Sequence, residues 1–104
     1  GPWVHWIVVN IPGDATGLPA GFHELDVPAG APSGLVQGKN TWGTVGYRGP
    51  APPKGHGTHH YHFKLYALDA VLHVAQGIEK HDLLEKLSGH IVARGELVGT
   101  YRRD

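Results

Sequence analysis

The chain has 104 residues, 9 histidines, no cysteine, and no formal net charge when the histidines are neutral. This length predicts a single small domain, and the missing cysteines exclude disulfides, thiolate nucleophiles and most structural zinc sites. Balanced charge gives no general attraction to nucleic acid or anionic membrane, and no apolar run approaches the roughly 18 residues of a membrane helix. Since no signal peptide is visible either, we predict a cytoplasmic protein with no nucleic-acid partner and no integral membrane segment.

The first predicted element is a strand over Trp3–Pro12. Its sequence, WVHWIVVNIP, is aromatic and β-branched, and its continuous apolarity is typical of a strand covered on both faces. Glycine, proline and alanine then dominate Gly13–Gly38, which indicates a long ordered loop with a short strand at His23–Val27. Trp42–Tyr47 is predicted as another short strand, and the proline- and glycine-rich Arg48–Gly57 as irregular.

The clearest strand is Thr58–Ala70, where alternate side chains should fall on opposite faces. One face carries His59, Tyr61, Phe63 and Leu65, and the other carries His60, His62, Lys64 and Tyr66. As large aromatic residues, Trp3, Trp6, Phe63 and Tyr66 are expected in the core.

A helix is predicted over Lys80–Ser88, because leucines recur there at helical spacing and Gly89 follows as a stop. His90–Arg102 is predicted as a closing strand, in which Gly95 and Gly99 mark bulges or close backbone approach. The fold class is therefore mainly antiparallel β with one short helix in the second half, as a single domain over residues 1–104.

The histidines around Thr58 allow several kinds of chemistry. His60 and His62 share a strand face and would form a zinc site with a third histidine, but no Asp or Glu lies within the cluster to support one. A serine hydrolase is disfavoured because Ser33 and Ser88 do not lie in a nucleophile elbow.

An anion site fits the residues better. Backbone N–H groups of a tight glycine-rich turn converge on phosphate or carboxylate groups, and a histidine at the following strand adds a tunable charge. His59 and Tyr61 should point to the same side, and His5 could bring a second imidazole from a neighbouring strand. Trp3 and the prolines would form apolar walls of a small cleft.

Three segments also resemble one known family, the phosphatidylethanolamine-binding or Raf-kinase-inhibitor-like proteins, in its bacterial and archaeal branch. They are WVHWIVVNIP, GPAPPKGHGTHHYHF from Gly49 to Phe63, and GHIVARGELVGTY from Gly89 to Tyr101. The resemblance implies a pocket for a phosphate-type head group or carboxylate. Carried over by position, its ligand-binding residues are Trp3, His5, Gly49, Ala51, Pro52, Pro53, His59 and Tyr61.

The family's Asp-Pro-Asp-x-Pro strand, expected before Trp3, has no counterpart in this sequence, so the domain is expected to be N-terminally truncated relative to the family. An opening strand with two apolar faces would leave an exposed edge. We therefore predict a homodimer, or a complex with a separate N-terminal segment, that buries the Trp3–Trp6 region.

Taken together, these features predict a binding module for a small anionic ligand that regulates a partner protein, as the resemblance implies, and that needs no metal or cofactor. One alternative is a small enzyme in which His5, His59 and Tyr61 perform acid–base chemistry, although the missing carboxylate partner disfavours it. The other alternative is a protein with a histidine-ligated metal.

Overall fold

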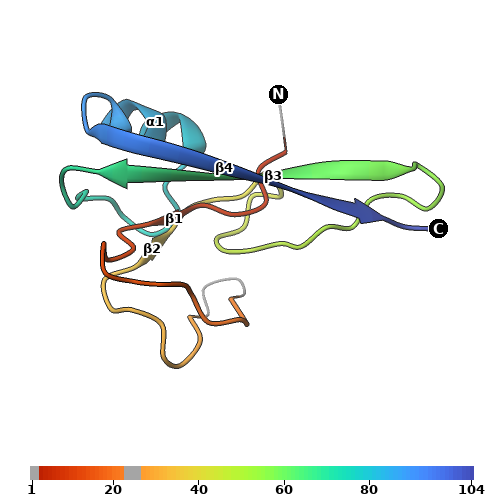
Figure 1. The fold of residues 1–104 in the computed structure, drawn as a ribbon, viewed down its shortest axis with the longest axis horizontal. Helices are drawn as coiled ribbons and strands as arrows, with labels where there is room; N and C mark the ends of the chain where they lie inside the picture. Colours follow the sequence, from red (N-terminus) through yellow and green to blue (C-terminus); the bar gives the residue numbers. More distant parts are fainter. Residues whose placement is uncertain (1–2, 23–26) are drawn as a thin grey trace.

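The computed structural model describes residues 3–22 and 27–104. In chain order the elements are β1 (Val8–Val9), β2 (Val36–Gln37), β3 (Thr58–Leu68), α1 (Lys80–Leu87) and β4 (Ile91–Arg102) (Figure 1). β1 pairs with β2 and β3 pairs with β4, and both pairings are antiparallel. The predicted class, mainly antiparallel β with a short helix, is confirmed.

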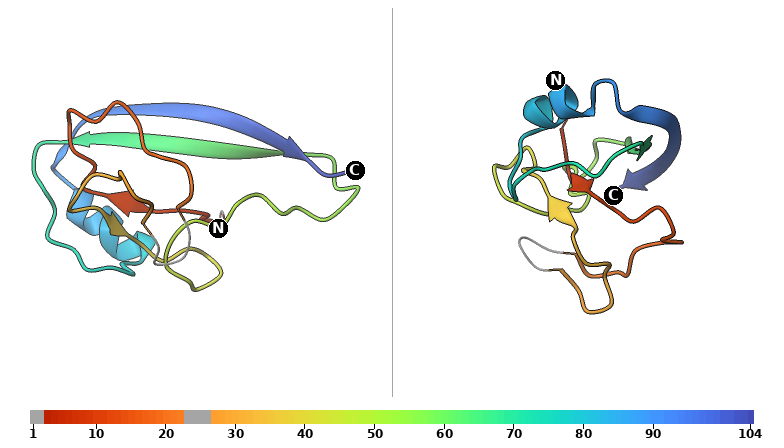
Figure 2. Two further views of the ribbon diagram at one scale, coloured as in Figure 1. Left: turned by 90° about the horizontal axis from the view of Figure 1, so that it is seen from below. Right: turned by 90° about the vertical axis from the view of Figure 1, so that its left-hand side faces the viewer.

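The antiparallel pair of β3 and β4 forms a long twisted ribbon along one side of the molecule (Figure 2). Its register runs from Thr58↔Arg102 to Leu68↔Ile91. The remaining elements, β1, β2 and α1, gather near the end of the ribbon where β3 stops and β4 begins (Figures 1 and 2). Both predicted ribbon strands are confirmed. The alternating pattern of β-branched and aromatic side chains favours extended backbone.

The bulges predicted at Gly95 and Gly99 are wrong, because both glycines pair in register with Leu65 and Tyr61. The irregularity lies instead between Ala67 and Leu68. A Cβ at Gly99 would lie 3.4 Å from Phe63 Cε2, which is an ordinary van der Waals contact with a side chain.

The strand predicted over Trp3–Pro12 is also wrong in length, since only Val8–Val9 pairs as a strand. Flanking residues still bond to other segments, but their partners are scattered: Thr41 N–H donates to Val4 O, and Gly38 N–H donates to Ile7 O. Irregular loops cannot supply the regular ladder of backbone hydrogen bonds that a continuous strand needs. Asn10 then turns the chain with a φ of 64°.

The segment predicted as a strand over Trp42–Tyr47 is a turn, with a single bridge between Lys39 and Val45. The buried Asn40 organises it: its Oδ1 accepts from Trp42 N–H, Thr44 N–H and the Thr44 hydroxyl, and its amide donates to Gly46 O. A side chain that replaces ladder bonds in this way favours a turn. The strand predicted at His23–Val27 falls almost wholly outside the described residues.

The core lies where the ribbon end meets α1 and β1. Its buried members are Ile7, Val9, Leu72 and Leu87, and partly buried residues pack against them: Val4, Val36, Leu68, Val74, Leu83 and Ile91. Helix α1 agrees with the sequence pattern, and Gly89 follows it with a left-handed φ of 82°.

The core positions predicted for Trp3 and Phe63 are wrong, because these side chains are 63% and 55% exposed. Trp6 and Tyr66 are partly buried. Trp3 lies away from the core cluster, and Phe63 is on a stretch of ribbon that the rest of the described chain does not cover. Alternation therefore predicted which residues share a face, but not whether that face is buried.

Candidate functional site

Aromatic side chains from three separate segments meet beside the start of β3. His5 lies edge-on to Tyr61, with ring centroids 5.1 Å apart, and edge-on to Trp42 at 4.8 Å. Trp3 contacts Trp42 from another side at 5.1 Å. We call Trp3, His5, Trp42, Arg48 and Tyr61 the aromatic cluster, and the backbone of Arg48 explains why it forms.

Two hydrogen bonds join His5 to Arg48. Arg48 N–H donates to His5 O at 3.0 Å, and the distance from His5 Nδ1 to Arg48 O is 2.7 Å. Because a carbonyl oxygen only accepts, Nδ1 carries the proton and the neutral ring has its lone pair on Nε2. The bond therefore selects both the tautomer and the orientation of the imidazole.

The cluster also contains a permanent cation. The guanidinium carbon of Arg48 lies 4.9 Å from the centroid of the Trp42 ring, in the range of a cation–π contact. Protonation of His5 would add a second positive charge and turn Nε2 into a donor. A guanidinium, an imidazole and a phenol hydroxyl among aromatic walls are suited to hold an anionic group.

The sequence-predicted residues separate in the structure. Trp3, His5 and Tyr61 lie in the cluster, whereas His59 stacks on His56 with centroids 6.1 Å apart. His59 still shares the ribbon face of Tyr61, since residues two apart on a strand point the same way.

The predicted site residues of the turn differ in burial and in their neighbours. Gly49 lies beside Tyr47, whose hydroxyl would be 3.4 Å from a Cβ placed there. Pro52 is buried, and Ala51 and Pro53 are exposed. None of these turn residues makes a described contact with the cluster, so their predicted roles stay predictions.

Trp42 and Arg48 are the members of the cluster that the sequence did not place in the site. Trp42 was predicted in a short strand, and Arg48 at the start of an irregular segment. Both are more than 35 residues from His5 along the chain. The Asn40-centred turn and the His5–Arg48 bonds bring them in. The signal available was that Arg48 is a cation at the start of the proline-rich turn.

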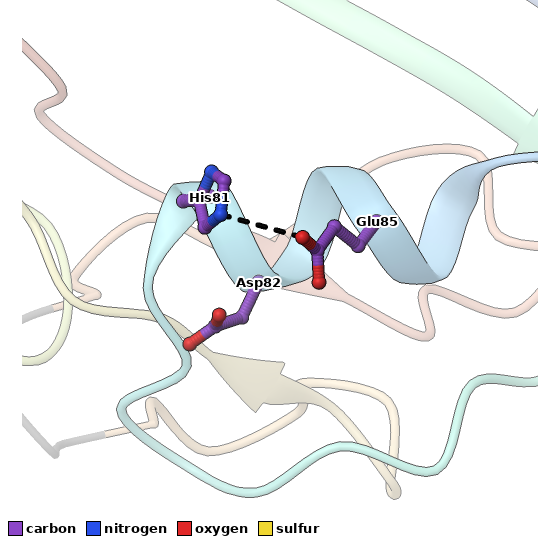
Figure 3. A group of neighbouring side chains, drawn as sticks. All are labelled: His81, Asp82 and Glu85. Carbon is purple, nitrogen blue, oxygen red and sulfur yellow. Dashed lines mark ion pairs between the residues drawn. The ribbon is translucent and has the colours of Figure 1, made fainter.

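A metal site at His60 and His62 gains no support. Within the described part of the chain, the His, Asp and Glu trio close enough to share an ion is His81, Asp82 and Glu85 on α1 (Figure 3). His81 and Glu85 form an exposed ion pair at 3.3 Å, with side chains 83% and 70% accessible. His62 instead faces Glu96 across the ribbon at 3.5 Å.

Two surface depressions of the molecule are lined by other residues. One of about 500 Å³ is lined by residues 73–78 and α1, and another of about 330 Å³ by Val4, residues 39–41 and the start of α1. Neither is lined by His5, His59 or Tyr61. The small cleft predicted at Trp3, His5, His59 and Tyr61 stays a prediction.

Comparison with known proteins places this chain in a family. Residues 1–102 match the phosphatidylethanolamine-binding protein family, and the chain belongs to it. A UPF0098 protein from Methanothermobacter thermautotrophicus is 52% identical over 103 residues, which cover 97% of this chain and 64% of that protein. A UPF0098 protein from Pyrococcus horikoshii is 45% identical over 106 residues, covering 99% of this chain and 51% of the relative.

Solved structures of relatives support the same family membership. A putative phosphatidylethanolamine-binding protein homologue from Chlamydia trachomatis superposes with a TM-score of 0.80 at 43% identity, over 98% of this chain and 60% of that one. YbcL of Escherichia coli, described as a new member of the mammalian family, gives 0.83 at 35% identity, over 98% and 62%. The resemblance inferred from the sequence is confirmed, and the chain spans between about half and two thirds of these relatives.

No helix within residues 3–22 and 27–104 has the length and apolarity needed to cross a membrane. The predicted cytoplasmic location stays a prediction.

Proposed function

We propose that this chain is a ligand-binding module that holds a small anionic group, of phosphate or carboxylate type, at the aromatic cluster. The observation that carries the proposal is the pair of hydrogen bonds between His5 and Arg48. They hold an imidazole of defined tautomer and the backbone of a permanent cation together, next to the ring of Tyr61. Membership of a family named for binding phosphatidylethanolamine supports a ligand of this class.

The proposed roles follow from the chemistry of each group. Arg48 supplies charge, and protonated His5 donates from Nε2 in a charge-assisted hydrogen bond. Trp3 and Trp42 provide apolar walls that restrict water around the anion. His59, on the same ribbon face as Tyr61, is proposed as a further donor at the edge of the site.

Two finer predictions remain open within this proposal. Regulation of a partner protein would require that the occupied cluster be recognised by that partner. Acid–base catalysis by His5, His59 and Tyr61 would require a substrate between them, and His59 stacks on His56 in this structure. Anion binding is the step that both would share, so it is tested first.

The test is calorimetric titration of the chain with inorganic phosphate and, separately, with acetate. The variant His5→Asn is chosen because an amide N–H can still donate to Arg48 O while the titratable ring is lost. A hydrogen bond to a charged group contributes about 1.5–3 kcal/mol, so affinity should fall by roughly tenfold or more. His60→Asn is the matched control, since His60 pairs with Thr100 on the opposite ribbon face.

Equal losses in both variants would show a general effect of histidine charge rather than a site. Unchanged affinity in His5→Asn would remove the cluster from the proposal altogether. Binding of phosphate without acetate would narrow the ligand to phosphate-type groups.

A further inference from the structure

Helix α1 carries three side chains that can donate to one metal ion. They are His81, Asp82 and Glu85, and one ligand atom from each lies within 4.8 Å of the other two. All three are exposed and come from the first and second turns of the helix (Figure 3). We call these residues the helix trio, and it is separate from the histidines around Thr58.

The spacing of the trio follows from helix geometry. Residues four apart lie one above the other on a helix, so His81 and Glu85 occupy the same face. Two ligands at this spacing bind zinc in the H-E-x-x-H motif, and this chain has His-Asp-Leu-Leu-Glu at residues 81–85. Glutamate stands in place of the second histidine, and carboxylate oxygen is also an established type of zinc ligand.

The distance between His81 Nε2 and Glu85 Oε1 is 3.3 Å. Zinc binds imidazole nitrogen and carboxylate oxygen at about 2.0–2.2 Å, so two such ligand atoms of a tetrahedral site lie roughly 3.3–3.6 Å apart. The two atoms therefore already have the separation of neighbouring zinc ligands, and the backbone of α1 does not have to change.

Asp82 supplies the third donor. Its side chain is exposed, and in the described part of the chain no cation forms an ion pair with its carboxylate. A change of its staggered rotamer can bring an oxygen toward the other two ligands without movement of the backbone. The trio then offers one nitrogen and two oxygens, which leaves a fourth tetrahedral position open.

A surface depression borders the trio on one side. Asp82 and Glu85 line the depression of about 500 Å³, together with residues 73–78. Water can therefore reach the open position of an ion held by the trio, as in zinc sites with three protein ligands.

The donor set selects the kind of ion. Imidazole suits zinc, copper, iron and nickel, whereas magnesium and calcium prefer sites made of oxygen alone. The two carboxylates also balance the charge of a divalent cation. A divalent transition metal is therefore favoured over magnesium and calcium.

We propose that the helix trio is a binding site for a divalent transition metal ion, for which zinc is the probe. His81 Nε2 and one oxygen each of Asp82 and Glu85 are the ligands, and water takes the fourth position. Because Leu83 and Leu87 of the same helix pack in the core, an ion that joins the two turns would also stabilise this packing. The inference is independent of anion binding at the aromatic cluster.

The test is a titration of the 104-residue chain with zinc chloride, without a histidine tag and in a buffer free of phosphate. Competition with a chromophoric zinc indicator measures the affinity, and NMR of the histidine side chains shows which imidazole the ion perturbs. We expect one zinc ion per chain at the strongest site, with the largest shift at His81. Magnesium chloride at the same concentration should not displace it.

The variants His81→Gln and Glu85→Gln each remove one ligand. Glutamine is a good helix former, so α1 should be retained, and circular dichroism checks this. Loss of a group that only orients a ligand costs about 10–100-fold in metal affinity, so loss of a ligand should cost at least about tenfold. The matched control is His62→Gln, since His62 lies 3.5 Å from Glu96 in a similar exposed pair to which the described chain adds no third ligand.

Three outcomes would overturn the proposal. The first is a zinc affinity that both α1 variants leave unchanged. The second is zinc binding that perturbs other histidines and not His81. The third is an equal loss in His62→Gln, which would show a general affinity of exposed histidines for the ion.

Discussion

The imidazole of His5 meets the ring of Tyr61 at an interplanar angle of 78°, although 56 positions separate them in the sequence. This edge-to-face contact joins the N-terminal segment to the ribbon and sets the position of both side chains. Tyr61 is therefore both a candidate ligand donor, through its hydroxyl, and a support for His5, through its ring.

These two roles of Tyr61 can be separated by substitution. Tyr61→Phe keeps the ring contact and removes the hydroxyl. The binding free energy of the anion should weaken by the contribution of one hydrogen bond, about 0.5–1.5 kcal/mol. Tyr61→Ala also removes the ring against which His5 packs, and its loss should be larger. Calorimetry with phosphate compares the variants, and equal affinities for Phe and Ala would show that the ring does not position His5.

His59 and His60 provide a test of the ribbon geometry. His59 pairs with Tyr101 and His60 pairs with Thr100, so neighbouring histidines occupy opposite faces. If His59 donates to the anion, His59→Ala should weaken binding by about 1.5–3 kcal/mol. His60→Ala should leave binding unchanged, and a loss of the same size there would contradict the assignment of the site to the Tyr61 face.

Asn10 is expected to be important for stability. Its side chain donates to Leu72 O at 2.8 Å and accepts from Leu72 N–H at 2.9 Å, and the residue has a left-handed φ of 64°. Asn10→Gly keeps the backbone conformation but leaves polar groups of the buried Leu72 unpaired, at a cost of about 1–3 kcal/mol. Asn10→Ala adds the left-handed penalty of roughly 1–2 kcal/mol, so urea unfolding should rank it below the glycine variant.

Gly38 should not tolerate a side chain. A Cβ there would lie 2.7 Å from Ile7 Cγ2 and 2.7 Å from the backbone oxygen of Ile78. Relief requires displacement of a buried residue and of backbone, so Gly38→Ala should lower the free energy of unfolding by about 1–3 kcal/mol. Gly13→Ala, with nothing within 4 Å of the added carbon, is the control, and a similar cost at both positions would refute close packing at Gly38.

Three elements of this protein, β3, β4 and α1, were determined by its sequence. Period-two alternation in Thr58–Leu68 and Ile91–Arg102 specifies extended strands and the residues that share each face. Leucines at helical spacing and the glycine after them specify α1. The three segments that resemble the family were also sufficient to identify it, because the resemblance depends on residue order alone.

Only the tertiary structure decided what covers each face and which side chains meet. Trp42 reaches His5 because Asn40 bends the intervening turn. Within Trp3–Pro12 only Val8–Val9 pairs with a strand, and its flanking residues bond to irregular loops. Phe63 has the residue type and spacing of a core position but lies exposed. The physical reason is that burial depends on a second surface from a distant part of the chain, or from another chain, and local periodicity contains no information about that surface.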